Sequence, residues 1–482
     1  MKLPRGRLLD AAIAGILLLA VLAAFGPILG HGFVFDDFAL IVDNPGIRGL
    51  DAARLRWMFT STYLTTYMPL GWAAFAAVFK LGGPSPAAFH AANLAAHGLV
   101  TLALFATARR LFRLAGEAKP DAPAFAAALL FCIHPFQVNT VAWAIELPDM
   151  LSTFFFLLAV LVYLGLSAAP GSKGGIPRLA AAFALFAVSL LFRWKSLSLP
   201  FVLVGLDYWP LRRLRARTGD PFDQARVGVW AEKAPFVILA IIAASLTFLA
   251  KSREVYAPSF APAAAARALW LYPWALIRPK DYLSAYALNG SGNSLGLPGW
   301  AALAAAILLT AALWRGRRRR PWLLLAWAGY AVAVLPPALN AQSGSVYVYL
   351  AYGYLGCLGL FILAGSAVRD RTGVAVVCAL AAAMIAGARL ESRHWRDPVS
   401  FWSRAVALDP GFSPARGQLG SALLASGRYD EAFFWLSARL SEAPGDEEAA
   451  AAMEALGRAA PGLKEEAARH ASRAASFRSA TR

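Results

Sequence analysis

Apolar residues in this chain come in runs of about twenty, the length that a helix needs to cross a bilayer. The third run is interrupted by His134-Pro135, and the sixth is short and contains Pro200. The pattern predicts about eleven spans, near residues 9–29, 88–108, 122–142, 149–168, 177–193, 196–210, 233–250, 299–314, 321–337, 346–365 and 373–390. Two other apolar segments, 70–82 and 262–287, are broken by Pro, Gly and charges, so we expect interfacial or re-entrant helices there.

The composition agrees with a membrane protein. Hydrophobic residues make up 59% of the chain and charged residues 15%, and the mean hydropathy is +0.54. Soluble domains have about 45–50% apolar and about 25% charged residues. The net charge of +18 would suggest nucleic acid in a soluble protein, but arginines that anchor cytoplasmic loops explain it here, so we expect no nucleic-acid partner. The spacing of Cys, His and Asp predicts neither a metal site nor a disulfide.

Lysine and arginine are distributed unevenly over alternate loops. If the N-terminus is cytoplasmic, the cytoplasmic segments hold about twice as many of these residues as the opposite short loops, which is the bias found in membrane proteins. This orientation places two large loops, 31–87 and 251–298, outside the cytoplasm. With an odd number of spans, the tail after residue 390 lies outside as well.

The tail is polar and rich in alanine, unlike the rest of the chain. Residues 413–446 match a tetratricopeptide repeat in a frame of about 34 residues, with Leu419-Gly420, Gly427, Tyr429, Ala432 and Pro444 at its characteristic positions. Phe401-Trp402 and Asp409-Pro410 indicate the second helix of an earlier unit, and 447–475 a terminal cap. We therefore predict a membrane domain over 1–390 and a repeat domain over 391–482 that binds peptide or protein. A generic helical hairpin is the alternative.

The first outer loop opens with two adjacent acidic residues, Asp36 and Asp37, just after the first apolar run. Carboxylates are costly inside a bilayer but stable at its boundary, where they can act on a substrate whose reactive group lies at the same depth. In the simpler interpretation, these residues only cap a following short helix.

Other polar residues are predicted to face the same side of the membrane as this pair. A carboxylate can serve as a general base, a cation can hold a leaving phosphate, and aromatic rings suit sugars. The set therefore predicts transfer of a sugar from a lipid-linked phosphate to a hydroxyl. Its members are His134, Asn139, Glu146, Asp149, Arg193, Lys195, Arg278, Lys280 and Tyr352. Each has a simpler interpretation: anchors at the interface, helix-start acids at Glu146 and Asp149, and a bundle histidine at His134.

Several motifs resemble one family. Phe33-Val-Phe-Asp-Asp-Phe38, followed by Ile41-Val-Asp-Asn-Pro45, resembles the first loop of the transmembrane and tetratricopeptide-repeat O-mannosyltransferase-like proteins, which belong to the GT-C superfamily of polytopic glycosyltransferases. The resemblance continues through 131–143, 149–155, 199–201, 206–212 and 395–397. It is greatest with the bacterial members.

The resemblance implies a GT-C-type helical bundle in a bacterial cytoplasmic (inner) membrane. It implies a polyprenyl-phosphate sugar donor, most naturally mannose, and inverting transfer to a protein or peptide hydroxyl. Asp36 or Asp37 is then the catalytic base, Asp149 matches a family acidic position and Arg193 a basic one. We add Lys195, Arg278 and Lys280 as further donor-phosphate ligands and His134, Asn139, Glu146 and Tyr352 as supporting residues. No cofactor is expected besides the lipid-phosphate sugar, and a divalent metal is left open.

The chain departs from the family pattern at three places. Asn139 stands where relatives often have an acid, Leu147 or Pro148 where they have a basic residue, and Leu350-Ala351-Tyr352 where they have Asp-Arg-Tyr. These departures motivate an alternative hypothesis, a non-catalytic membrane-anchored repeat scaffold for envelope proteins.

Overall fold

The computed structural model describes residues 5–166, 175–214, 224–252, 262–282, 285–287, 296–338, 341–342 and 345–481. Contacts divide the chain into two compact units. The first, which we call the membrane unit, contains Met1–Leu29 and Asp36–Ser392. The second, the repeat unit, contains Gly30–Phe35 and Arg393–Arg482.

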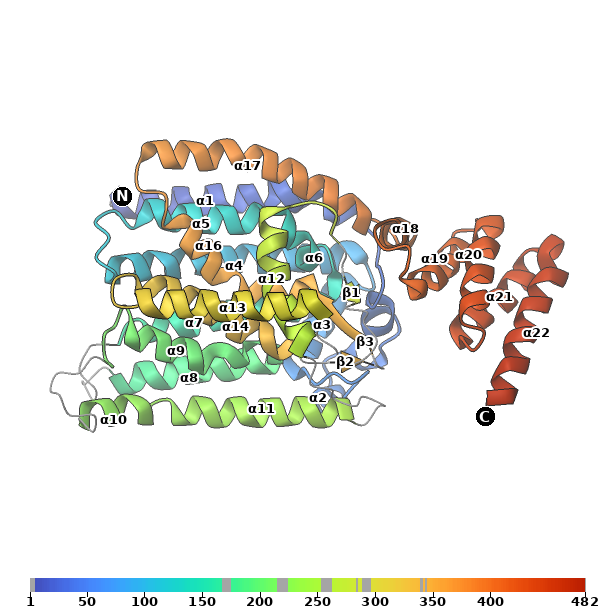
Figure 1. Ribbon diagram of the computed structural model, residues 1–482, viewed down its shortest axis with the longest axis horizontal. Coiled ribbons are helices and arrows are strands. Elements are labelled where there is room, and N and C mark those ends of the chain that lie inside the picture. The colour runs from blue at the N-terminus through green and yellow to red at the C-terminus, as the bar shows by residue number, and fades with distance from the viewer. Residues whose placement is uncertain are drawn as a thin grey trace. The chain divides into compact units, whose positions relative to one another are not determined.

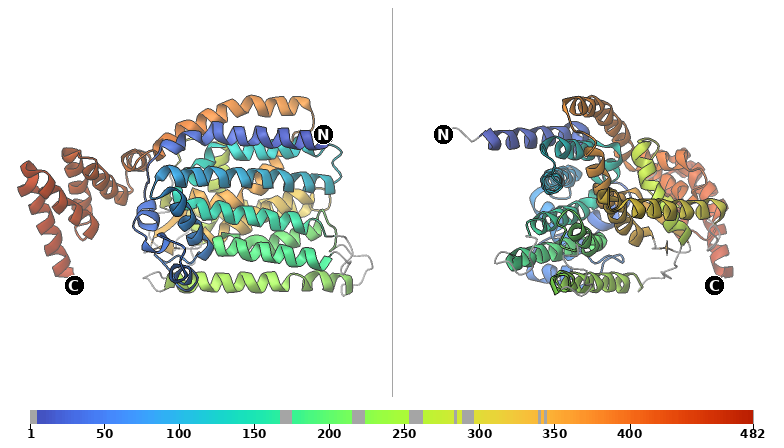
Figure 2. Two further views of the ribbon diagram at one scale, coloured as in Figure 1. Left: turned by 180° about the vertical axis from the view of Figure 1, so that it is seen from behind. Right: turned by 60° about the vertical axis from the view of Figure 1, so that its left-hand side comes forward.

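The membrane unit is almost entirely helical, as predicted. Its long helices run side by side in a bundle (Figures 1 and 2). Its α-helices are α1 Arg5–Phe25, α2 Ala52–Thr60, α3 Pro69–Gly82, α4 Pro86–Leu114, α5 Asp121–Ile133, α6 Val138–Val141, α7 Leu147–Tyr163, α8 Gly175–Phe192, α9 Leu199–Tyr208, α10 Gln224–Ala231, α11 Ala234–Ser252, α12 Pro262–Ile277, α13 Gly296–Gly316, α14 Pro321–Ala338, α15 Gly353–Gly356, α16 Leu358–Gly365 and α17 Arg371–Ser392. The short turns that matter below are the π-helical turn η2 Phe38–Val42 and the 3-10 turns η4 Pro135–Gln137, η5 Ala144–Glu146, η6 Trp194–Ser198 and η7 Leu350–Tyr352.

Seven helices in the described residues are long and apolar enough to cross a membrane, and a bent pair would make an eighth. The bent pair joins α5 to the segment Pro135–Val141 at an angle of 50°. The bend follows from Pro135, which has no N–H to donate and favours an extended residue before it; His134 has ψ 132°. The predicted break at His134-Pro135 is thus confirmed, while the total of eleven spans stays a prediction.

The predicted tenth span, 346–365, is wrong as a single helix. Its first residues form strand β3, Ser345–Tyr349, and the turn η7, and the helical part is split between α15 and α16. Val346-Tyr-Val-Tyr349 is rich in β-branched and aromatic residues, which favour strands over helices. Strand β3 pairs antiparallel with β1, Ala285–Ala287, and with β2, Ala341–Gln342, in a sheet of order β1-β3-β2.

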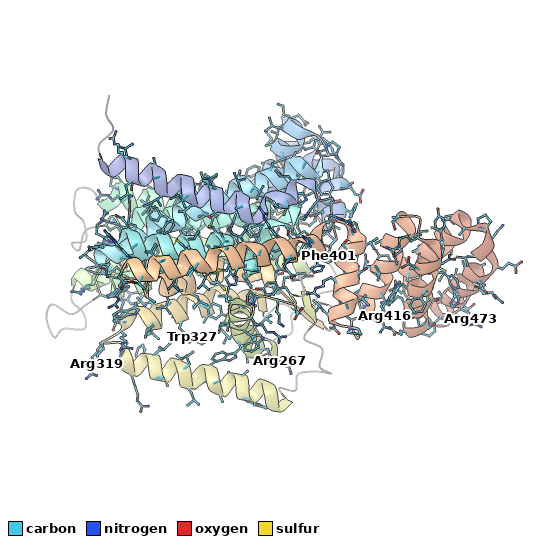
Figure 3. The ribbon with its side chains drawn as sticks, turned by 90° about the horizontal axis from the view of Figure 1, so that it is seen from above. Arg267, Arg319, Trp327, Phe401, Arg416 and Arg473 are labelled. Atoms are coloured by element: carbon cyan, nitrogen blue, oxygen red, sulfur yellow. The ribbon has the colours of Figure 1, made fainter. Side chains whose placement is uncertain are left out.

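The membrane unit has two different ends. Helices α2 and α3, which follow the acidic pair, lie with the small sheet at one end of the bundle (Figure 1). The arginine-rich turn after α13, which includes Arg319, lies at the other end, where α1 begins (Figure 3). Opposite ends for these two segments agree with the charge bias along the chain, and the side of the membrane that each end faces stays a prediction.

The repeat unit is built from helical hairpins, as its sequence predicts. Its helices are α18 Pro398–Leu408, α19 Ser413–Ala425, α20 Tyr429–Glu442, α21 Glu447–Ala459 and α22 Lys464–Thr481. Gly427, between α19 and α20, has φ +76°, a conformation that glycine adopts without strain. A Cβ at Gly420 would lie 2.7 Å from Cγ of Leu436, so this glycine lets the two helices of the hairpin approach closely.

One domain assignment is corrected by the structure. Residues 31–35 were predicted to belong to the membrane domain with the rest of the first loop, but they lie in the repeat unit. The N–H of Gly32 donates to the carbonyl of Arg396 at 2.8 Å. The Phe35 ring packs against Phe401 and Trp402, with ring centroids 6.0 and 5.1 Å away. Burial of this aromatic segment outweighs its proximity in sequence to Asp36.

Candidate active site

The two acidic residues of the first loop have different environments. Asp37 is fully buried, and its Oδ1 accepts a hydrogen bond of 3.0 Å from the N–H of Ile145, far away in sequence. Asp37 stands at the N-cap position of η2, but its side chain makes no capping hydrogen bond there. The capping interpretation is therefore wrong for Asp37. Asp36 is only partly buried.

Two carboxylates and two cations form an ion-pair cluster beside this loop. Asp149 lies 3.0 Å from Nε of Arg193 and 2.5 Å from Nζ of Lys195, and Glu146 lies 3.4 Å from the same Nζ. All four side chains are at most 13% exposed. The positive and negative charges are equal in number, so each buried charge has a partner of opposite sign, and loss of one partner would leave a costly unpaired charge.

The cluster is assembled from two sequence segments that the fold brings together. Glu146 ends η5 and Asp149 lies in the first turn of α7, where Pro148 suits the start of a helix. Arg193 and Lys195 lie at the end of α8 and in η6. Contact between α7 and α8 therefore sets the distance between the two carboxylates and the two cations.

Three buried serines fix this helix contact. The hydroxyl of Ser152 lies 2.8 Å from that of Ser196 and 3.2 Å from that of Ser189, and Ser189 lies 2.8 Å from Ser196. The hydroxyl of Ser152 also lies 2.9 Å from the carbonyl of Ser189 and 3.2 Å from that of Arg193, two alternative acceptors for its single hydrogen. The serines come from α7, α8 and η6, so this serine triangle connects the three elements that carry the cluster.

Arg193 has one hydrogen bond to a weak partner. Its Nη1 donates to the thioether sulfur of Met68 at 2.8 Å. A thioether is a poor acceptor compared with a carboxylate or phosphate oxygen. The guanidinium therefore keeps binding capacity for an anion at this side.

Electrostatics connect Asp36 to the same cluster. Burial raises the pKa of Asp36 to about 6, and the charge of Arg193 opposes this rise. Burial alone would lower the pKa of Arg193, but the carboxylates of Asp149 and Glu146 raise it above its ordinary value. Lys195 lies over the ring of Tyr352, with Nζ 4.4 Å from the centroid. The structure thus brings together six predicted residues: Asp36, Glu146, Asp149, Arg193, Lys195 and Tyr352.

Four other predicted residues lie apart from this cluster in the contacts that the described residues make. Nδ1 of His134 accepts from the N–H of Phe136 at 3.1 Å, and its Nε2 pairs with the carbonyl of Leu276 at 3.1 Å, as expected for a structural histidine. Asn139 is buried and donates to the carbonyl of Phe136 at 3.4 Å. Arg278 and Lys280 are exposed beyond the end of α12, and Arg278 pairs with Asp281.

Three kinds of residue at the site were not predicted: Met68, the serine triangle and Asn93. Serine and methionine in apolar runs carry no pattern that distinguishes a buried partner from a packing residue. Asn93 lies within an apolar helix, where a buried amide is costly unless it is hydrogen-bonded. An asparagine in an apolar run was therefore the signal in the sequence that could have identified this residue. In the described part of the chain, no group of three or more His, Cys, Asp or Glu is placed to hold a metal ion.

Fold and site together define a multi-pass membrane protein with a buried cluster of carboxylates and cations at one end of its bundle and a separate helical repeat unit. A family model described as tetratricopeptide repeat matches residues 401–456, which confirms the repeat.

Curated relatives match part of the chain. The mouse protein "Protein O-mannosyl-transferase TMTC1" is 36% identical over 172 residues, which is 33% of this chain and 17% of the mouse protein. The human protein of that name is 36% identical over 168 residues, 32% of this chain and 18% of the relative. The Caenorhabditis elegans protein "Protein O-mannosyl-transferase F38B6.6" is 29% identical over 143 residues, 28% of this chain and 20% of the relative.

These matches confirm the predicted resemblance to the transmembrane and tetratricopeptide-repeat O-mannosyltransferase-like proteins. The chain matches about a fifth or less of the length of these relatives. The resemblance to bacterial members in particular stays a prediction. No solved structure matches the chain.

Proposed function

We propose that this protein is a membrane glycosyltransferase that moves a sugar, mannose in the first instance, from a polyprenyl-phosphate donor to a hydroxyl of a protein or peptide. The observation that carries the proposal is the partly buried carboxyl of Asp36 beside the cluster of Arg193, Lys195, Asp149 and Glu146. Burial raises the pKa of Asp36 to about 6, and the charge of Arg193 opposes this rise. A carboxylate with that pKa is ionised at neutral pH and is a stronger base than an exposed aspartate.

Asp36 takes the proton of the acceptor hydroxyl. The oxygen of that hydroxyl attacks the anomeric carbon of the sugar, the bond from this carbon to the phosphate oxygen breaks, and the phosphate keeps the electron pair. Attack from the face opposite the phosphate inverts the anomeric centre. Asp37 is held by Ile145 and is buried, so we assign it to anchoring the loop.

Arg193 and Lys195 bind the donor phosphate and stabilise the charge that develops on it. Asp149 pairs with both cations and Glu146 pairs with Lys195, which holds the cations in place before substrate arrives. A phosphate oxygen replaces the sulfur of Met68 as the partner of Nη1 of Arg193, which exchanges a weak hydrogen bond for a charge-assisted one. Arg278 and Lys280 are exposed, so we give them at most a role in attracting the anionic donor.

The repeat unit supports a protein or peptide acceptor, because tetratricopeptide repeats are protein-binding modules. The relatives named protein O-mannosyl-transferases point to the same class of acceptor. In this proposal the repeat recruits the acceptor or a partner, and the chemistry takes place in the membrane unit.

The test is a transfer assay with the purified full-length protein in nanodiscs. Candidate polyprenyl-phosphate sugars, mannose first, are incubated with a serine- and threonine-containing peptide, and the glycosylated peptide is measured by mass spectrometry. The double variant Asp36→Asn, Asp37→Asn should abolish transfer while its melting curve stays cooperative.

The scaffold alternative is decided by the same assay. Undiminished turnover in the double variant would sink the proposed mechanism. No transfer by the wild type from any lipid-phosphate sugar, combined with retained binding of a partner by the repeat unit, would favour a scaffold.

A further inference from the structure

The segment that joins α6 to α7 consists of two non-helical residues, Ala142 and Trp143, and the 3-10 turn η5, Ala144–Glu146. This segment and Val141 before it are buried, so their backbone groups need partners within the protein. The carboxamide of Asn93 on α4 supplies two: its Nδ2 donates to the carbonyls of Val141 and Trp143, at 3.1 and 2.7 Å. Asn93 is fully buried.

The other end of this segment is held by the first loop. The N–H of Ile145 donates to Oδ1 of Asp37 at 3.0 Å, and the N–H of Glu146 donates to the carbonyl of Trp143 at 3.1 Å. The carbonyl of Trp143 thus serves Asn93 and Glu146 at once. One buried amide therefore fixes the backbone that anchors the loop carboxylates and presents Glu146 to Lys195.

We propose that Asn93 is a positioning residue for the active site, which it controls by clamping Val141–Ile145 between α4 and the first loop. The proposal deepens the glycosyltransferase function and rests on it for its catalytic meaning. Asn93 touches neither the donor cations nor Asp36 in this scheme. Asn93 sets the position of Ile145, whose N–H donates to Asp37. The position of Asp37 in turn fixes the backbone of the adjacent Asp36.

A merely structural Asn93 would satisfy two carbonyls and nothing more. Its loss would then lower the melting temperature and leave the exposure of position 36 unchanged. A positioning role predicts instead that loss of the amide loosens the loop and hydrates position 36. These two outcomes can be separated without any enzymatic assay.

The first experiment measures the exposure of position 36 in the full-length protein in nanodiscs. The background variant carries Cys378→Ser, which removes the exposed native thiol. Cys132 and Cys357 are buried and are left in place. In that background, Asp36→Cys is labelled with a water-soluble maleimide, with and without Asn93→Ala. Asn93→Ala removes two hydrogen bonds, and loss of one ordinary hydrogen bond corresponds to about fivefold, so we expect the labelling rate to rise by about fivefold or more.

Thr107→Val is the matched control. Thr107 lies on the same helix and is also buried, and it donates to a carbonyl of a neighbouring helix, that of Leu157, at 3.4 Å. It should leave the labelling of position 36 unchanged. If Asn93→Ala does not fold, Asn93→Gln keeps both N–H donors but moves them by one methylene, and it should raise the labelling rate by a smaller factor. Equal labelling rates in all variants that fold would overturn the proposal.

The second experiment follows the pH dependence of sugar transfer with Asp36 intact. The groups that face Asp36 are Arg193 and Tyr352, with Asp37 beside it in the chain. In Asn93→Ala, hydration of Asp36 should move the acid limb of the rate profile from near pH 6 towards the ordinary value of 3.8, and Thr107→Val should not. An unmoved limb in both variants would also overturn the proposal. Failure of the wild type to transfer sugar counts against the proposed function. In that case the labelling experiment alone tests whether Asn93 positions the loop.

Discussion

Replacing Asp36 and Asp37 one at a time distinguishes the roles proposed for the two acidic residues of the first loop. Asp36→Asn removes the proposed base, so transfer should fall by about 10²–10⁴-fold, the usual contribution of a positioned general base. Asp37→Asn removes a charge but keeps an amide oxygen that can accept from the N–H of Ile145. A neutral hydrogen bond is weaker than a charged one by about 1 kcal/mol, so this variant should lose no more than about tenfold.

The assay is transfer from polyprenyl-phosphate mannose to a peptide by purified protein, measured between pH 5 and 8. Burial raises the pKa of Asp36 to about 6, and only the deprotonated carboxylate accepts the hydroxyl proton. Wild-type activity should therefore rise with pH through about 6 and level off above it. Asp37→Asn should keep this rise in activity near pH 6, and the residual activity of Asp36→Asn should no longer show it.

Two results would refute this reasoning. An inactive Asp37→Asn beside an Asp36→Asn variant with more than a tenth of wild-type activity would reverse the roles of the two residues. Full activity in both single variants would mean that neither is the base. Melting curves of each variant exclude unfolding as the cause.

Three other predictions follow from single contacts. Arg193→Gln should raise the pKa of Asp36 further, because the cation that opposes the effect of burial is lost. In pH–rate profiles, the acid limb of the residual activity should move above pH 6. Arg193→Lys keeps the cation and should leave the limb in place. Ser189→Ala removes one corner of the serine triangle, so donor affinity measured by isothermal titration should fall by about fivefold or more, with little change in volume at the helix contact. Gly420→Val should clash with Leu436 and destabilise the repeat unit by about 1–3 kcal/mol, seen as a lower melting transition, while transfer to a small free acceptor continues.

The elements that the sequence predicted well depend on short-range patterns. The first apolar run corresponds to α1, the second to α4 and the last to α17, because about twenty consecutive apolar residues have few alternatives to a membrane helix. The break at His134-Pro135 follows from the chemistry of proline alone. The repeat followed from small residues at fixed spacings, such as Gly420 and Ala432, which pack against the neighbouring helix of the same hairpin.

The predictions that failed concern competition between distant partners. Val346-Tyr-Val-Tyr349 is apolar enough for a span, but pairing with β1 makes it a strand. Residues 31–35 are next to the membrane unit in sequence, yet the ring of Phe35 packs with Phe401 and Trp402 in the repeat unit. Neither partner can be identified from local composition.

The sequence by itself determined that this is a multi-pass helical membrane protein with a tetratricopeptide repeat, and it supplied the residue types for a site: an acidic loop, four cations and two further acids. Only the tertiary structure decided which of them meet. Contact of α7 with α8 brings Asp149 to Arg193 and Lys195, while Arg278 and Lys280 remain exposed beyond the end of α12. Only the fold distinguishes Asp36 from Asp37, because the two differ in burial and in hydrogen bonding to Ile145, a partner more than a hundred residues away in the chain.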